Sequence, residues 1–475
     1  MLTRRSGLAS SLRIGSRALA VAALLVHASG SPAAAQQGNT TVLANAAAAS
    51  PANRPAAADV AAPVTFAKDI APIFQKNCQQ CHQSGAIGPM PLTTFQEVRP
   101  WARAIKQKVV AGEMPPYRYD RDVGIQKLKN DLRLSAQDIQ TIARWVDAGA
   151  PLGNPADMPP PVTFPDPNKW ALAEQFGPPD LVIRTKPFTV QARGQDVWWR
   201  PVVPIGLTKD RCLKAVSVKP SMRGRAAAHH ANTELLVFDE KQNQYIEGER
   251  LTEYALGKVG EIVPLDACRT IPANSMVRWD VHYYPTGKEL EDDVIEMGLW
   301  LYPEGHQATH KQDLKLYTLL MKGGELEIPP NGTAMTQGFH TFKTPVRIDS
   351  FQPHGHFRLV AKTLEIFYPE TGKLEMVSSV SNWTNNWHTS HIYDEDSAPL
   401  VPKGAVLVIT GYYDNTAGNK QNPDPDQWVG LGSRTADEMS HAWIAVTHLD
   451  EPTYTRLATE REERKKNATE KHSAP

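Results

Sequence analysis

The spacing of apolar residues changes along the chain, and this change constrains the fold more than any other feature. Between residues 63 and 152 apolar residues recur at helical spacing, as in FAKDIAPIFQKN and LSAQDIQTIARWVDAGAP. A proline-rich linker follows over residues 153–178. Beyond it, apolar and polar residues alternate in short runs such as MVRWDVHYY and AVLVITGYY, which is typical of half-buried strands. The chain therefore has a helical front and a long β-rich remainder.

Length and charge limit the organisation and the class of partner. A chain of 475 residues is too long for one core. Its 51 basic and 51 acidic residues cancel, so nothing in the charge directs it to nucleic acid. Many short strands without alternating helices favour two antiparallel sandwiches, which we expect over residues 179–308 and 309–452. Residues 453–475 are expected to be a charged tail.

The first 35 residues predict an exported protein. They combine arginines, a short apolar run and the small-residue pattern Ala33-x-Ala35, which together are typical of a signal peptide and its cleavage site. The apolar run is roughly half of what spans a bilayer, so a retained anchor is the weaker interpretation. We expect a flexible leader over residues 36–62, a periplasmic or secreted location and no transmembrane segment in the mature chain.

Cys78, Cys81 and His82 form a Cys-x-x-Cys-His motif. Two thiols at this spacing can attach a haem while the adjacent imidazole ligates its iron. A zinc site and a redox pair are the alternatives, but an export signal before the motif and helices after it favour one covalent haem c. The expected second axial ligand is Met114, in a loop made rigid by two prolines, because Met90 follows His82 too closely to reach the opposite face of the ring. Ligation by Met and His suits an electron carrier.

The two remaining cysteines are Cys212 and Cys268. An oxidising compartment favours a structural disulfide between them over two free thiols. The sequence alone does not place them near each other.

Three histidine-bearing stretches in the β-rich part are candidate metal sites. His229 and His230 are neighbours, and one metal can take both only at a bend or strand end. His282 lies on the polar face of a predicted strand, where it either reaches a ligand or is plain surface. His354 and His356 share one face of a predicted strand, which is the geometry for two imidazoles on one metal.

A methionine stands in the fourth candidate stretch. In RTADEMSHAWIAV, Met439 is expected on the same strand face as His441 and Trp443. A thioether beside imidazoles favours copper, because soft sulfur holds Cu(I) while imidazole serves both oxidation states.

In their order, these motifs resemble the copper type II ascorbate-dependent monooxygenases, the family of the peptide-amidating (peptidylglycine α-hydroxylating) and dopamine-hydroxylating enzymes. HH, a strand-borne H, HxH and DEM before a final strand follow one another as in that family, together with NWTNNW and GYYDNTAGNKQNPDPDQWVG. The resemblance spans about residues 179–449, whereas residues 63–152 resemble small cytochromes c. The implied fold class is multidomain: a small all-α cytochrome c domain followed by two all-β antiparallel jelly-roll sandwich domains.

The same resemblance implies two copper ions and their ligands. One copper, which stores and passes an electron, would be held by His229, His230 and His282. A second copper, with an open position for O2, would be held by the candidate catalytic residues His354, His356 and Met439. In the family the two coppers face each other across a solvent cleft.

The chain departs from the amidating enzymes where these grip a glycine carboxylate. Gln352 replaces an arginine two residues before HxH, and His441 and Trp443 replace an asparagine and a tyrosine that follow the methionine. A peptide ending in glycine is therefore not the expected substrate, and a flatter, more apolar or aromatic ligand is indicated.

These features together predict a periplasmic or secreted, haem c-linked dicopper monooxygenase that hydroxylates a C–H bond of a small organic substrate with O2. A periplasmic electron donor would deliver electrons through the haem in place of ascorbate. One alternative is a non-catalytic haem and copper electron-transfer or copper-binding protein. The other is a carbohydrate- or protein-binding module whose histidines hold no metal.

Overall fold

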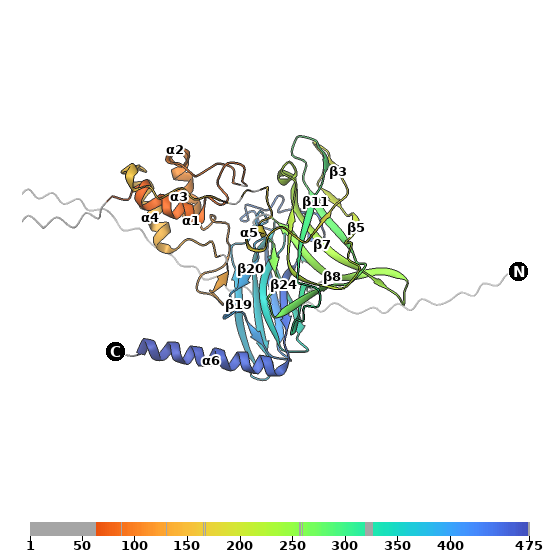
Figure 1. The fold of residues 1–475 in the computed structure, drawn as a ribbon. Coiled ribbons are helices and arrows are strands. Elements are labelled where there is room, and N and C mark those ends of the chain that lie inside the picture. The colour runs from red at the N-terminus through yellow and green to blue at the C-terminus, as the bar shows by residue number, and fades with distance from the viewer. Residues whose placement is uncertain are drawn as a thin grey trace, which may run out of the picture. The chain divides into compact units, whose positions relative to one another are not determined.

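The structure is a computed structural model that describes residues 63–473, except residues 87, 130, 165, 167, 256, 257, 259 and 319–325 (Figure 1). The chain divides into two compact units, 1–61 and 62–475. The predicted signal peptide and leader lie outside the described residues, so only the second unit is described below.

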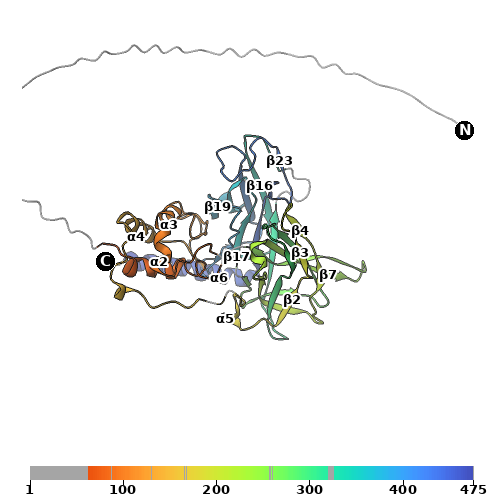
Figure 2. The same cartoon turned by 90° about the horizontal axis from the view of Figure 1, so that it is seen from above.

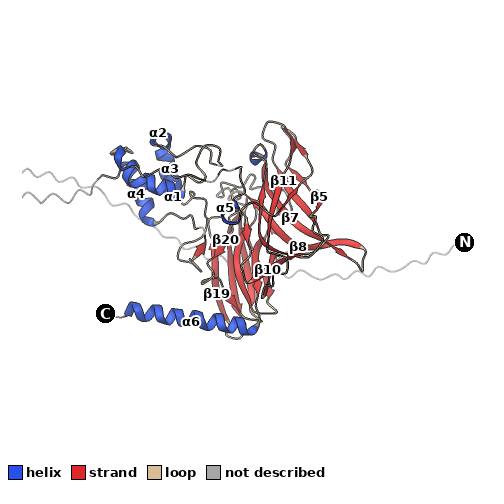
Figure 3. Cartoon of the chain, in the orientation of Figure 1, coloured by secondary structure: helices blue, strands red, loops and turns tan. Residues whose placement is uncertain are grey.

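The helical elements concentrate in residues 63–152, here called the N-terminal helical segment (Figure 3). The α-helices are α1 (Ala71–Asn77), α2 (Phe95–Val98), α3 (Ala102–Val110), α4 (Ala136–Asp147), α5 (Ala173–Phe176) and α6 (Glu451–Ser473). The shorter turns are the π-helical η1 (Phe66–Ile70) and the 3-10 turns η2 (Arg99–Trp101), η3 (Pro155–Asp157) and η4 (Gly224–Ala226).

Strands make up most of the rest. Those that precede residue 302 are β1 (Leu128–Lys129), β2 (Leu181–Arg184), β3 (Phe188–Val190), β4 (Val197–Trp199), β5 (Val202–Pro204), β6 (Arg211–Lys219), β7 (Ala228–Asp239), β8 (Gln244–Ala255), β9 (Glu261–Ile262), β10 (Ala267–Ile271), β11 (Met276–Tyr283), β12 (Leu290–Asp293) and β13 (Glu296–Leu301). The later ones are β14 (His310–Thr318), β15 (Glu327–Ile328), β16 (Thr333–Thr341), β17 (Val346–His354), β18 (Leu359–Tyr368), β19 (Lys373–Val380), β20 (His391–Tyr393), β21 (Leu400–Val401), β22 (Val406–Asp414), β23 (Val429–Gly430) and β24 (His441–His448).

Two β-sandwiches form from these strands (Figures 1 and 2). In the first, β6, β13 and β2 pack against the sheet β4-β11-β7-β8, and the apolar residues of both faces form one core. In the second, β17 and β24 pack against the sheet β16-β22-β18-β19 around a separate core. On β11, Val277, Trp279, Val281 and Tyr283 are fully buried, as the alternating pattern predicts.

One 11-stranded sheet runs through both sandwiches in the order β1-β20-β17-β24-β14-β10-β6-β13-β2, with β21 and β9 at its sides. The junction is a parallel pairing of β10 with β14, in which Ala267 lies opposite His310. Next to it, the Cys212–Cys268 disulfide joins β6 to β10, with the two Cα atoms 5.4 Å apart. The expected disulfide is therefore confirmed, and it lies at the junction of the sandwiches.

The predicted fold class is wrong. The described residues are mostly β-structure, and α1 to α5 are only 4 to 12 residues long. No all-α cytochrome domain forms among them, because the segment between α3 and α4 leaves the helices: β1 pairs with β20, and Ile125 and Leu128 pack against the core of the second sandwich. The two sandwiches share the 11-stranded sheet.

Local sequence signals explain the helices that do form. Ser135 and Asp138 make the expected capping box before α4: the Ser135 hydroxyl accepts from the Asp138 N–H at 3.0 Å, and the Asp138 carboxylate accepts from the Ser135 N–H at 3.2 Å. Gly112 follows the end of α3 with φ near +64°, a conformation that glycine adopts at low cost. The N-terminal helical segment packs around its own cluster, which includes Phe66, Phe74 and Trp145.

Residues 453–473 of the predicted tail lie within the charged helix α6, Glu451–Ser473, and its last two residues lie outside the described part of the chain. Among the described residues, no helix is long and apolar enough to cross a membrane.

Candidate metal centre

His229 and His230 lie at the start of β7, where the strand carries a β-bulge. On the neighbouring β11, His282 is opposite His230 and Tyr283 is opposite Ala228, so His229 is the extra residue. A bulge re-aims side chains that would otherwise point to opposite faces. As a result, ligand nitrogens of His229, His230 and His282 lie within 4.8 Å of one another. This triplet is called the first ligand group below.

A second ligand group consists of Glu253, His354 and His388, whose ligand atoms also lie within 4.8 Å of one another. Glu253 is on β8 of the first sandwich, His354 is the last residue of β17, and His388 is in the loop between β19 and β20. All three side chains are buried. Sequence reasoning found His354 but missed Glu253 and His388.

The two ligand groups are adjacent. The ring of His230 lies 6.2 Å from that of His354 and 6.0 Å from that of His388, between centroids. His229 and His388 are 5.7 Å apart by the same measure. The side chains of His230 and His354 are each only 3% exposed, so the solvent cleft expected from the family resemblance does not separate them here.

His356 and His441 surround His354. The centroids of His354 and His356 lie 5.6 Å apart, although His356 follows the end of β17 and does not share its face. Gly355 between them is required sterically, because a Cβ at this position would lie 2.5 Å from Leu359. The ring of His441 stacks on that of His354 at 4.2 Å.

Met439 lies in the turn before β24, which begins at His441, and not on the strand itself. Glu438 ties this turn to the loop that carries His356. Its buried carboxylate accepts from the backbone N–H of Met439 at 2.9 Å, of Arg358 at 2.8 Å, and of His356. Burial raises the pKa of Glu438 to about 7. The turn with Met439 is therefore held beside the His354–His356 loop.

Several ring nitrogens in this centre are buried without a hydrogen-bond partner in the described part of the chain. They are Nδ1 of His229, His230 and His354, and both nitrogens of His388. An unpaired buried polar atom costs roughly 1–3 kcal/mol, so such a concentration is unfavourable unless something binds there. The donor set fits a metal ion with imidazole ligands.

Hydrogen bonds orient two of the rings. Nε2 of His282 lies 2.7 Å from a carboxylate oxygen of Asp196, and Nδ1 of His356 lies 3.1 Å from the backbone carbonyl of Asp437. A ring nitrogen that donates to such an acceptor leaves the other nitrogen free to bind a metal.

Five of these rings, those of His229, His230, His282, His354 and His356, are held in the neutral form that metals require. Burial lowers the pKa of His229 to about 3 and that of His356 to about 4. Burial also lowers the pKa of His282, and it moves the pKa values of His230 and His354 well below the usual range.

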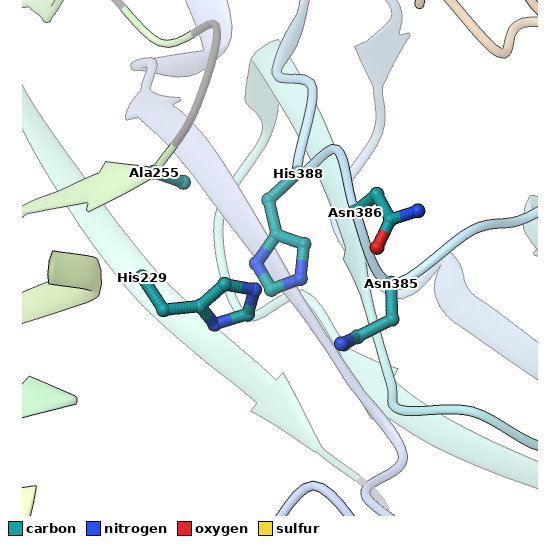
Figure 4. Close-up of a pocket in the computed structure, with 5 residues that line it drawn as sticks. All are labelled: His229, Ala255, Asn385, Asn386 and His388. Atoms are coloured by element: carbon teal, nitrogen blue, oxygen red, sulfur yellow. The ribbon is translucent and has the colours of Figure 1, made fainter. Parts of the chain in front are cut away.

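A narrow pocket opens beside the centre and is lined by His229, Ala255, Asn385, Asn386 and His388 (Figure 4). The rings of His229 and His388 lie next to each other at this pocket, with their planes nearly perpendicular (Figure 4). The space among its lining atoms, including the part open to solvent, is about 150 Å³. The pocket is therefore tight for an organic substrate.

Gln352 and Trp443 do not line that pocket. The Gln352 amide donates to the Glu253 carboxylate and accepts from Lys258 at 3.1 Å, so it links the sandwiches. Trp443 is buried and packs under the Arg250 guanidinium at 4.5 Å. The aromatic substrate contact expected from Trp443 therefore has no support from its position.

The Cys-x-x-Cys-His motif begins at the end of α1. Cys78 and Cys81 are free thiols, and burial raises the pKa of both. Nδ1 of His82 lies 3.0 Å from the Met90 carbonyl, which leaves Nε2 available as a ligand. Cys78, Met90 and Met114 all pack against the cluster of the N-terminal helical segment. The Met90 backbone lies on the Nδ1 side of His82, so Cys78, Cys81 and His82 fit haem attachment, whereas Met114 as the other ligand stays a prediction.

The loop after Met114 contacts the loop that carries His388. The Thr389 hydroxyl donates to the Pro116 carbonyl at 3.1 Å. The rings of Tyr117 and Tyr119 pack against His391 at 5.1 and 4.8 Å. The candidate haem ligand and the second ligand group are thus joined through a short stretch of chain and one hydrogen bond.

No family model and no curated protein matches the chain. Solved structures are similar only at a distance. PNGF-II is 9% identical over 57% of this chain and 65% of its own, just under two thirds of its length, with a TM-score of 0.25. A peptide-N(4)-(N-acetyl-β-D-glucosaminyl) asparagine amidase is 10% identical over 57% and 97%, with a TM-score of 0.24. A fucolectin from striped bass (Morone saxatilis) serum is 9% identical over 57% and 86%, with a TM-score of 0.14. At these TM-scores none of the three carries an argument about this chain.

Proposed function

We propose that this chain is a copper-dependent monooxygenase that hydroxylates a C–H bond of a small organic substrate. The observation that carries this function is the convergence of buried, neutral and unpaired imidazoles from both sandwiches. Copper bound there would supply one-electron redox chemistry and a position for O2. We assign one ion to His229, His230 and His282, and a second to His354, His356 and Met439.

The chain's own groups prepare these ligands. Asp196 and the Asp437 carbonyl each hold one nitrogen of His282 and His356, which assigns the other nitrogen to the metal; for His282 this is Nδ1, 3.3 Å from Nε2 of His230. Burial keeps the rings unprotonated, so no proton must leave when a metal binds. Burial also excludes bulk water from the centre, which limits loss of reducing equivalents to side reactions.

Hydroxylation consumes one O2, two electrons and two protons, and yields the alcohol and one water. We propose that a periplasmic donor supplies both electrons through a haem c attached to Cys78 and Cys81, with His82 and Met114 as axial ligands. Support comes from the hydrogen bond between Thr389 and the Pro116 carbonyl, because it links the segment of the haem ligand to the segment of His388.

Oxygen uptake tests this function directly. The full chain, loaded with haem and copper and supplied with a reduced donor, should consume O2 in step with a hydroxylated product when candidate substrates are screened. Met439→Leu should abolish product formation while the fold, followed by circular dichroism, is retained. Met335→Leu, at an exposed methionine on β16, is the matched control and should behave as wild type.

The role of the haem can be tested separately from that of the copper ligands. Replacing Cys78 and Cys81 by Ala should remove the haem absorbance and stop turnover driven by the protein donor. Turnover with a small chemical reductant should survive, because the imidazoles are untouched. Undiminished donor-driven turnover in this variant would mean that the haem has another task.

The narrow pocket favours a second candidate function. A pocket this tight suits a haem and copper electron carrier or copper-binding protein as well as an enzyme. Such a protein would load copper and reduce it through the haem, yet show no O2 uptake coupled to any organic substrate.

A further inference from the structure

We propose that Glu253, His354 and His388 bind one first-row divalent metal ion between the two sandwiches. The inference deepens the proposed function, on which it rests for the nature of the ion. It adds Glu253 and His388, one from each sandwich, to the ligands of the second metal, of which His354 is already one. The family resemblance assigns neither Glu253 nor His388.

Glu253 presents an unpaired carboxylate oxygen to the centre. Its side chain is buried, and one oxygen accepts from the Gln352 amide. The other oxygen, Oε1, has no hydrogen-bond partner among the described residues. A buried carboxylate is costly unless it is fully paired or coordinates a metal. Because Lys258 holds the Gln352 amide, Gln352 fixes the orientation in which Oε1 faces His388.

His388 presents two unpaired nitrogens to the same point. Its ring is 4.7 Å from that of His354 and 5.5 Å from that of Trp383, between centroids. Its side chain is 3% exposed, so water does not cover the ring. Burial of an imidazole with both nitrogens unpaired is rare in native proteins, and a ligand for one nitrogen removes most of that cost.

Glu253 and His388 do not satisfy each other's unpaired atoms by a direct hydrogen bond. Nδ1 of His388 and Oε1 of Glu253 are 3.9 Å apart, too long for a hydrogen bond. Two atoms that bind the same metal ion lie apart from each other with the ion between them. The distance between Nδ1 of His388 and Oε1 of Glu253 therefore suits two ligands of one ion. Two imidazoles with one carboxylate favour Zn2+, Fe2+ or Cu2+ over Mg2+ and Ca2+, which prefer oxygen ligands.

Zn2+ titration of the metal-free full chain by calorimetry tests this site without oxygen, substrate or haem reduction. We expect Glu253→Gln and His388→Ala each to weaken one Zn2+ equivalent of the wild type by at least about 100-fold, because even partners of ligands cost 10–100-fold. His391→Phe alters a buried imidazole of the same segment outside the centre and should leave both stoichiometry and affinity unchanged.

Co2+ provides a second readout, since its visible absorption reports a change of ligands. Glu253→Gln preserves the volume of the side chain. It therefore tests whether Glu253 is a ligand even if His388→Ala does not fold. Unchanged Zn2+ affinity and Co2+ spectrum in Glu253→Gln, with loss of the same equivalent in His356→Ala, would overturn the inference and leave the proposed function standing. Loss of the Zn2+ equivalent in Glu253→Gln, together with no O2 uptake coupled to a substrate in the wild type, would contradict the proposed function but support this metal site.

Discussion

His230 and His354 belong to different β-sandwiches, yet the centroids of their rings lie 6.2 Å apart. Each ring is part of one three-residue ligand group. The two groups therefore make up one buried centre and not two sites on opposite walls of a solvent cleft.

Two Cu2+ ions held in the adjacent ligand groups should be magnetically coupled. We expect the integrated EPR intensity of the chain loaded with two Cu2+ ions to fall below its copper content, because neighbouring unpaired spins couple. In His282→Ala, which removes a ligand of the first group, the intensity per bound copper should return to the full value. Full intensity in the doubly loaded wild type would show that the groups separate in solution.

Glu438→Gln should loosen the loop of His356. The carboxylate accepts backbone N–H groups from both the loop and the turn, and an amide cannot accept through its nitrogen. At least one buried N–H is then unpaired, so urea unfolding should show a loss of about 1–3 kcal/mol. Asp437→Asn is the control: its carboxylate pairs with the exposed Arg434, a surface contact worth about 1 kcal/mol or less. Equal losses in the two variants would contradict the role given to Glu438.

His391→Phe should reduce the acid sensitivity of folding. Burial lowers the pKa of His391 to about 3 in the folded chain from its usual 6.5, with Arg133 acting in the same direction. The carboxylates of Asp120 and Asp131 oppose this shift. Between pH 6.5 and 3 the unfolded chain binds a proton that the folded chain does not, so stability is lost as pH falls through this window.

The phenylalanine variant cannot titrate at this position. Between pH 7 and pH 5, urea unfolding should therefore show a loss that is smaller than in the wild type by about 2 kcal/mol. The comparison between the two chains cancels the contribution of the other histidines. An identical loss in both chains would mean that His391 is accessible to protons in the folded protein.

Replacing Cys212 and Cys268 by Ser should lower the free energy of unfolding. The disulfide closes a loop with a sequence separation of 56 residues. The chain-entropy model assigns to a loop of that length roughly 4 kcal/mol. Urea unfolding of the double variant measures the loss, and a reducing agent should destabilise the wild type but not the variant.

Gly88→Ala should impair haem attachment. A Cβ at this position would lie 2.6 Å from Nδ1 of His82, so the ring must move from its bond with the Met90 carbonyl. The haem absorbance per chain should fall relative to wild type. Gly85→Ala adds strain at a positive φ in the same loop but contacts nothing within 4 Å, and should retain the haem.

Local patterns predicted local features well. The buried face of β11 follows from its period of two, because alternation along a strand needs no knowledge of its neighbours. The need for a bend at His229 was equally local, and the bulge supplies it. The thiol spacing and the capping box of α4 are signals of the same kind.

The rest depended on pairings that no local pattern encodes. Glu253 reads as an ordinary polar residue of β8 and becomes a candidate ligand only because the second sandwich covers it. His388 lies in a loop without periodicity. Its position directly after the NWTNNW stretch is the sequence signal that points to a functional role. The parallel pairing of β10 with β14 joins two strands that are not consecutive in the chain, so a sheet shared by both sandwiches does not follow from the local pattern.

The parallel seam between β10 and β14 has a mechanical consequence. Backbone hydrogen bonds between β10 and β14 join the two sandwiches edge to edge, and the disulfide fixes β10 to β6 within the first sandwich, so this seam opposes a separation of the sandwiches. A molecule that reaches the imidazoles through the pocket passes the loop of Asn385 and His388, so the position of that loop, and not a movement of the sandwiches, sets access to the centre.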